Sequence, residues 1–156
     1  MIRPKIYLDI CCFNRPYDDQ SQLRIEIETK AKLFIQQLVE RHEIDLVWSY
    51  MLDYENSRNI YTQKRIAIQE WQLLATNDIN ETPEIIQHSE EIQKTGIKNV
   101  DSLHIACAID ANCNYFISVD RRLLKYRETG IVFCDPIEFL RIWEKLKNDE
   151  QHSFIK

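Results

Sequence analysis

The chain has 156 residues, 44% of them hydrophobic and 29% charged, a composition that excludes a disordered chain and fits one folded domain. Its formal net charge of −5 excludes binding to nucleic acid or anionic membranes through overall positive charge, although local basic patches remain compatible with it. No apolar run approaches the roughly 20 residues that span a bilayer, and the first residues lack the apolar region of a signal peptide. We therefore expect a cytoplasmic protein.

In its first half the sequence alternates between short apolar runs and longer amphipathic stretches. The run "KIYLD" ends in Asp9, and "IDLVWS" ends in Ser49, whose hydroxyl suits the N-cap of a following helix. Pro16 and a pair of aspartates mark a turn before the first long amphipathic stretch. These patterns predict strands at 5–9 and 44–49, a turn at 14–20, and helices at about 20–41 and 50–75, the second with a break near residue 60.

The second half continues the alternation after a polar loop, "NDINETPE". Pro83 suits the first turn of a helix, and Gly96 suits its end. The patterns predict helices at about 83–96, 100–112 and 136–147, strands at 115–119 and 131–133, and a short helical turn at 121–127. We expect a single domain over residues 1–148, followed by a polar, frayed tail at 149–156.

Strands that alternate with helices indicate an α/β fold with a central, mostly parallel sheet of four to five strands. The five cysteines are an odd number and form no C-x-x-C pair, so neither a disulfide framework nor a zinc site is expected. We expect reduced cysteines that are buried or partly buried in the core.

Four acidic residues are expected at one edge of this sheet, where the strands end and function gathers in open parallel sheets. Asp9 and Asp120 each end a predicted strand. Asp101 begins the helix that leads back to the 115–119 strand, and Glu55 lies in the second turn of the helix after Ser49. Asp110 is roughly 13 Å from Asp101 along the same helix, so it lies at the opposite edge.

Four carboxylates at one place repel one another unless a cation offsets their charge. Mg²⁺ or Mn²⁺ suits such a site, because these ions take oxygen ligands and often bind a few carboxylates together with a substrate phosphate. His104 lies one turn after Asp101 in a mainly apolar run, and we expect a packing histidine there rather than a metal ligand. Each acid, taken alone, is equally compatible with a cap, a turn or an exposed helix position.

Three segments resemble the PIN-domain family of metal-dependent ribonucleases, which includes the VapC-type toxins. They are "YLDICCFNRPYDDQ", "WSYMLDYEN" and "NVDSLHIACAIDANCNYFISVDRRLL". The resemblance implies a PIN-like α/β/α sandwich and a catalytic, metal-binding role for Asp9, Glu55, Asp101 and Asp120. It selects Glu55 over Asp53, and these two side chains point about 200° apart on a helix, so only one of them can face the site.

Two positions depart from the pattern of the family. Ile10 stands where many members have a small polar residue, and Leu123 stands where several have a further acid. These departures leave the four acids intact and are equally compatible with a subgroup that has another cellular role.

The leading hypothesis is a Mg²⁺- or Mn²⁺-dependent endoribonuclease that cleaves single-stranded RNA. Arg121, Arg122 and Lys125 are expected to contact phosphates, and Asn14 to supply a polar group near the site. The resemblance also implies a cognate antitoxin and a homodimer. Two alternatives stay open: a structure-specific DNA nuclease, and a non-catalytic PIN-like module that binds RNA or protein.

Overall fold

The computed structural model describes residues 3–155 and has a five-stranded parallel sheet at its centre. The strand order is β3-β2-β1-β4-β5, which confirms the predicted α/β class and parallel sheet. The strands are β1 (Lys5–Leu8), β2 (Asp45–Ser49), β3 (Asn77–Ile79), β4 (Tyr115–Ile117) and β5 (Val132–Cys134).

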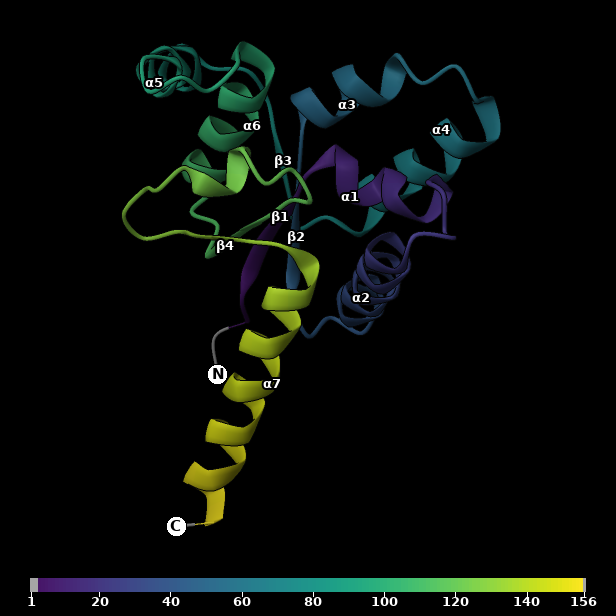
Figure 1. Cartoon of the computed structure of the whole chain (residues 1–156). Helices are drawn as coiled ribbons and strands as arrows, with labels where there is room; N and C mark the ends of the chain where they lie inside the picture. Colours follow the sequence, from purple (N-terminus) through teal and green to yellow (C-terminus); the bar gives the residue numbers. More distant parts are fainter. Residues whose placement is uncertain (1–2, 156) are drawn as a thin grey trace.

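Helices cover both faces of the sheet (Figure 1). The chain moves from β1 to β2 in one direction and from β3 to β4 in the other, so right-handed crossovers place the connecting helices on opposite faces. The helices are α1 (Ile10–Asn14), α2 (Leu23–Glu40), α3 (Tyr50–Ser57), α4 (Thr62–Gln69), α5 (Pro83–Gln93), α6 (Asn99–Asp110) and α7 (Pro136–Ile155), with short 3-10 turns η1 (Arg15–Tyr17), η2 (Glu70–Leu74) and η3 (Leu123–Lys125).

The strand order reverses beside β1, and this reversal fixes the position of the site. β1 pairs with β2 on one side and with β4 on the other, with Leu8 opposite Ile117. The backbone N–H of Asp9 donates to the carbonyl of Ile117 at 2.9 Å. The residues that follow β1 and β4 therefore lie side by side at the carboxyl edge of the sheet, where ligands bind in open α/β folds.

The core lies between the sheet and its helices, and its centre is aromatic. Tyr7 stacks on Phe116 with ring centroids 5.3 Å apart, and Trp48 packs edge-on against Phe13. All five cysteines are free, four of them buried and Cys11 partly buried, as the sequence predicted. Within residues 3–155, no helix is both long and apolar enough to cross a membrane.

Three elements differ from the sequence prediction. The turn expected at 14–20 is preceded by α1, because the Asp9 side chain accepts a hydrogen bond from the N–H of Ile10 and caps a five-residue helix. β3 lies inside the expected polar loop; its backbone pairs with β2, which requires no apolar side chains. α7 continues to Ile155 instead of ending near residue 147, because no glycine or proline interrupts it.

Candidate metal centre

The structure brings all four predicted acids to the carboxyl edge of the sheet. Asp9 directly follows β1, and Asp120 follows β4 after two loop residues. Asp101 lies in the first turn of α6, and Glu55 lies in the second turn of α3. Asp110 ends α6 at its other terminus and is exposed, as the helical rise predicted.

Asp9 is the most buried of these acids, with 5% of its surface exposed. One carboxylate oxygen accepts from the N–H of Ile10, and the other accepts from the Ser118 hydroxyl at 2.9 Å and from the Cys11 thiol at 3.3 Å. Ser118 also accepts from the N–H of Asp120 at 3.1 Å. A single buried hydroxyl therefore connects the two acids that follow neighbouring strands.

His104 lies between Glu55 and the core and uses both ring nitrogens. Its Nε2 hydrogen-bonds to the Glu55 carboxylate, and its Nδ1 hydrogen-bonds to the Tyr7 hydroxyl at 2.5 Å. Tyr7 and Ser49 are in turn joined at 2.7 Å. A hydrogen-bonded chain thus runs from Ser49 at the end of β2, through Tyr7 in β1 and His104 in α6, to Glu55 in α3.

Burial and neighbouring charges shift the pKa values of two groups at the site, Asp101 and His104. Burial raises the pKa of Asp101, and the carboxylates of Asp9 and Asp120 raise it further. Burial lowers the pKa of His104, but the hydrogen bond to Glu55 and the neighbouring carboxylates outweigh burial and raise this pKa overall. Both shifts are those expected of uncompensated negative charge.

The donor set fits a divalent cation. Ligand atoms of Asp9, Glu55 and His104 all lie within 4.8 Å of one another, and two of the three residues are buried. Asp101 and Asp120 add carboxylates whose charges reach the same place, as the pKa of Asp101 shows. A site dominated by carboxylate oxygens suits Mg²⁺ or Mn²⁺ better than softer metals, and one imidazole is compatible with Mn²⁺.

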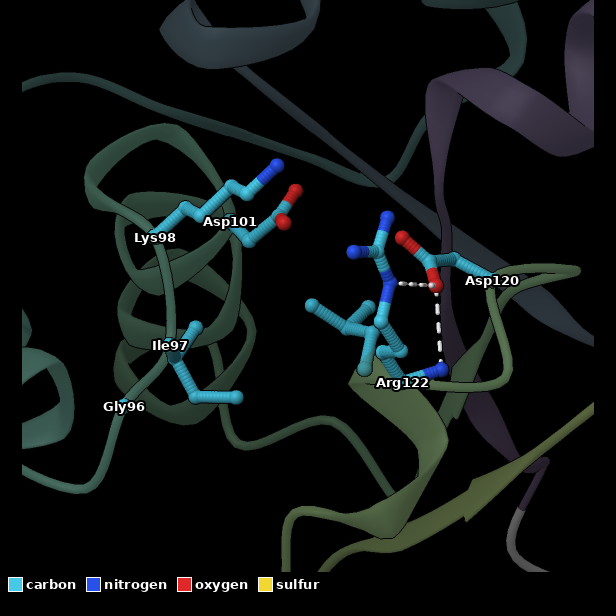
Figure 2. Close-up of a pocket in the computed structure, with 7 residues that line it drawn as sticks. Gly96, Ile97, Lys98, Asp101, Asp120 and Arg122 are labelled. Atoms are coloured by element: carbon cyan, nitrogen blue, oxygen red, sulfur yellow. Dashed lines mark hydrogen bonds and ion pairs between the residues drawn. The ribbon is translucent and has the colours of Figure 1, made fainter.

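Asp101 and Asp120 face each other across a hollow (Figure 2). Lys98 and Asp101 point into it from the start of α6, and Arg122 points into it from the loop after β4. The Asp120 carboxylate accepts from the N–H of Arg122 at 3.0 Å, and the guanidinium of Arg122 lies 4.0 Å from it. Both cations are exposed, so they lie at the rim of the acidic site.

The residues expected to contact substrate are divided between two hollows. Arg122 lines the hollow with Asp101 and Asp120, whereas Arg121 and Lys125 are exposed and do not belong to the lining that the structure describes there. Asn14 lines a second hollow together with Glu55. Its Oδ1 is buried without a hydrogen-bond partner in the described part of the chain.

Glu55, not Asp53, faces the site. The Asp53 carboxylate accepts from the Trp48 indole at 2.9 Å and from the Gln69 amide at 2.7 Å, so it joins α3 to its neighbours. His104 is a satisfied buried histidine, as expected, but it also belongs to the group of possible metal ligands, which the sequence reading disfavoured. Ser118 was not singled out; a serine at the end of a buried strand, two residues before Asp120, is the sequence signal for it.

No model of a known protein family matches the sequence, and no curated protein matches it. Several solved structures are similar in backbone, and two of them are VapBC structures. One is VapBC2 from Rickettsia felis bound to a DNA fragment from the promoter, with a TM-score of 0.50 and 14% identity, covering 83% of this chain and 96% of that chain. The other is VapBC-1 from nontypeable Haemophilus influenzae, with a TM-score of 0.53 and 19% identity, covering 85% of this chain and 98% of that chain.

At such low identity the likeness concerns the backbone alone. The arrangement that these neighbours share with this chain is a parallel sheet between helical layers. The chain therefore has the PIN-like α/β/α fold of its VapC neighbours.

Proposed function

We propose that the chain is a metal-dependent endoribonuclease that hydrolyses phosphodiester bonds of single-stranded RNA. The proposal is supported by the position of Asp9, Glu55, Asp101 and Asp120 at the carboxyl edge of the sheet, beside the reversal of strand order, where ligand atoms of Asp9 and Glu55 lie within 4.8 Å of each other. Mg²⁺ or Mn²⁺ would supply the missing charge. The PIN-like fold supports the proposal, because the motifs that resemble PIN nucleases occupy this same edge.

Each acid has a role that follows from its surroundings. Asp9, Asp101 and Asp120 would hold the metal, and Glu55 would bind it or orient the attacking water. A bound divalent ion activates water and stabilises the charge that develops on a phosphodiester oxygen. His104, held by Tyr7, fixes the orientation of the Glu55 carboxylate.

The cations at the rim would position the substrate. Arg122 lies beside Asp120 and is exposed, so its guanidinium is free to meet a phosphate as the strand enters the hollow. Arg121 and Lys125 extend the same positive surface over the loop after β4. Contacts of this kind position a strand without reading its sequence.

The cellular role that we propose is that of a toxin controlled by an antitoxin. The two solved structures described above are VapBC structures, which supports a small partner protein that covers the acidic edge. We also propose that the chain forms a homodimer and acts in the cytoplasm.

A cleavage assay tests the proposed activity. End-labelled single-stranded RNA and single-stranded DNA of the same sequence are incubated with the protein and Mn²⁺, Mg²⁺ or a chelator. We expect RNA cleavage with either metal and none with the chelator. Asp101→Asn should abolish cleavage, whereas the matched Asp110→Asn, at the far end of the same helix, should cleave like the wild type.

The alternatives give different results in the same assay. Preferential cleavage of DNA would indicate a DNA nuclease. Full activity of Asp101→Asn would remove this residue from the mechanism, and binding of RNA without cleavage under any metal would indicate a non-catalytic module.

A further inference from the structure

The acid site lies in the middle of a longer run of three adjoining hollows. The first is lined by Asn14, Tyr61 and Lys64, and it shares Glu55 and Arg58 with the second. The second shares Lys98 and Asp101 with the third, which is the hollow shown in Figure 2. The acids therefore have a polar approach on the α3–α4 side as well as at the loop after β4.

The far end of this run carries exposed tyrosines and cations. Tyr17, Tyr54 and Tyr61 expose 52%, 46% and 65% of their surfaces, respectively. The Lys64 ammonium lies 5.0 Å from the ring centroid of Tyr17 and 5.9 Å from that of Tyr61. The Arg58 guanidinium lies 5.6 Å from the ring centroid of Tyr54. We call these five residues the tyrosine–cation surface.

The two cations of this surface have no acidic partner. In the part of the chain that the structure describes, neither Arg58 nor Lys64 has a carboxylate within ion-pair distance; Arg58 donates instead to the Tyr54 hydroxyl at 2.7 Å. Six other lysines and arginines of the described residues do form ion pairs, such as Lys147 with Glu43 at 3.4 Å. In a chain with a net charge of −5, unpaired cations beside an acid site favour an anionic ligand.

The surface is held in place by hydrogen bonds behind it. The buried Asn56 amide donates to the Arg65 carbonyl at 2.9 Å and to Gln69 Oε1 at 3.0 Å, which joins α3 to α4. Asn59 Oδ1 accepts from the N–H of Tyr61 at 3.1 Å and fixes the connecting loop. Each ring contacts a cation and still exposes about half or more of its surface, so the rings are available for stacking without a large ordering cost.

We propose that the tyrosine–cation surface is a subsite for single-stranded nucleic acid, which stacks bases on the tyrosine rings and pairs phosphates with Lys64 and Arg58. This inference rests on the proposed function, because the bound strand runs through the shared hollow to the acids. Aromatic platforms interleaved with cations bind unpaired strands, whose bases have free faces. Asn14 lines the same hollow and places a polar side chain beside the bound strand.

Binding without chemistry tests the subsite. The full chain is titrated, in the presence of EDTA, into a fluorescein-labelled uridine oligonucleotide of about 12 residues, and anisotropy gives the Kd. A thymidine oligonucleotide and an RNA duplex are measured in parallel. We expect both single strands to bind, and the duplex, whose bases are stacked inside, to bind independently of Tyr61.

Three variants separate stacking from charge. Tyr61→Ala should weaken single-strand binding about tenfold, whereas Tyr61→Phe, which keeps the ring, should bind like the wild type. Lys64→Gln should reduce the slope of log affinity against log salt by about 0.7, the effect of one lost phosphate contact. Lys145→Gln removes the same charge from an exposed position on α7 and is the matched control.

The outcomes distinguish the subsite from the catalytic proposal. Unchanged binding by Tyr61→Ala and Lys64→Gln, or no single-strand binding by the wild type, would overturn the subsite even if RNA is cleaved with Mn²⁺. Weakened binding by these variants, together with no cleavage by the wild type, would keep the subsite and overturn the nuclease. Equal loss in Tyr61→Ala and Tyr61→Phe would exclude stacking.

Discussion

Two groups of carboxylates lie at the carboxyl edge of the sheet, and they differ in what balances their charge. In the first group, Glu28 of α2 is fully buried. Its carboxylate oxygens lie 3.2 Å from the Arg15 guanidinium and 3.6 Å from that of Arg24. The Arg24 guanidinium also lies 3.9 Å from the Asp135 carboxylate. At the candidate metal centre, among the described residues, the nearest guanidinium is that of Arg122, at the rim and 4.0 Å from Asp120.

This difference in charge balance distinguishes a structural cluster of acids from the proposed functional one. Acids that the chain pairs with its own arginines hold helices and strand ends together and need no ligand. Acids that the chain leaves uncompensated, at a place where strand order reverses, need a cation from outside. Charge balance, rather than the number of acids, therefore indicates which cluster is the site.

The largest expected effect lies in the paired cluster. Arg15→Gln leaves the buried Glu28 with only the half-exposed Arg24, so we expect the free energy of unfolding at neutral pH to fall by about 3 kcal/mol. Burial raises the pKa of Glu28 in spite of both arginines, and losing one raises it further. The stability that protonated Glu28 provides is present below its unfolded pKa and is lost as pH rises through the raised folded pKa.

Urea denaturation of Arg15→Gln at several pH values measures this effect. The deficit relative to wild type should be smallest near pH 4 and should grow toward pH 7. The exposed Arg41→Gln, at the C-terminal end of α2 and away from Glu28, is the control and should match the wild type. A deficit independent of pH would show that Arg15 acts through packing alone.

At the candidate metal centre, removing one charge should leave the folding stability unchanged and weaken metal binding instead. Asp120→Asn keeps an oxygen to accept from the N–H of Arg122, so the metal-free fold should retain its stability. Mn²⁺ affinity should fall about a hundredfold, the upper end of the loss typical for a residue that only orients a ligand. Isothermal titration calorimetry measures the affinity. The melting temperature of the wild type should rise with Mn²⁺ and that of Asp120→Asn should not.

Asp110→Asn is the control for that experiment, because this residue lies at the other edge and is exposed. If Asp120→Asn bound Mn²⁺ like the wild type, Asp120 would not be a ligand. If the wild type bound no Mn²⁺ at all, the charge balance of a cluster would not indicate whether it binds a metal.

A buried cation with no carboxylate partner among the described residues gives a third case. Lys32 is buried over the Phe13 ring at 5.3 Å, and burial lowers its pKa to about 8. Because this pKa is depressed from 10.5, stability should increase as pH rises from about 8 to about 10.5. Lys32→Met should raise the free energy of unfolding at pH 7 by about 2 kcal/mol and should lose this pH dependence.

Thermal denaturation from pH 7 to 10.5 checks the prediction for Lys32. A neighbouring exposed lysine, Lys30→Met, controls for the change in side chain. A Lys32→Met protein less stable than the wild type at pH 7 would mean that the contact with Phe13 outweighs the cost of burial.

The smallest expected effect tests how the core supports the site. Burial raises the pKa of Tyr7, so its hydroxyl stays protonated and hydrogen-bonded to His104 and Ser49. Tyr7→Phe frees one side of the imidazole and should weaken Mn²⁺ binding about tenfold. Tyr115→Phe, at the other end of the sheet, should bind Mn²⁺ normally. Equal affinities in all three proteins would limit the Tyr7 hydroxyl to a packing role.

The sequence was sufficient to place three acids, because Asp9, Asp101 and Asp120 are positioned by the ends of regular elements. The choice of Glu55 over Asp53 depended on the resemblance to the PIN-domain family. The partner of Glu55 was not predictable, since His104 is 49 residues away and Tyr7 is 97 residues from His104, so only tertiary packing joins them. β3 was missed because a short polar edge strand gains its pairing from the neighbouring backbone and shows no apolar alternation.

The position of β1 also sets the order in which the site is assembled during translation. This strand leaves the ribosome before its neighbours β2 and β4, which follow some 40 and 110 residues later. Until Ser118 and Asp120 have emerged, Asp9 lacks the hydroxyl donor of Ser118 and the neighbouring carboxylate of Asp120. The acidic edge is therefore incomplete while the first four strands are being made, and the nuclease proposed above would be inert until β4 and the loop after it have emerged.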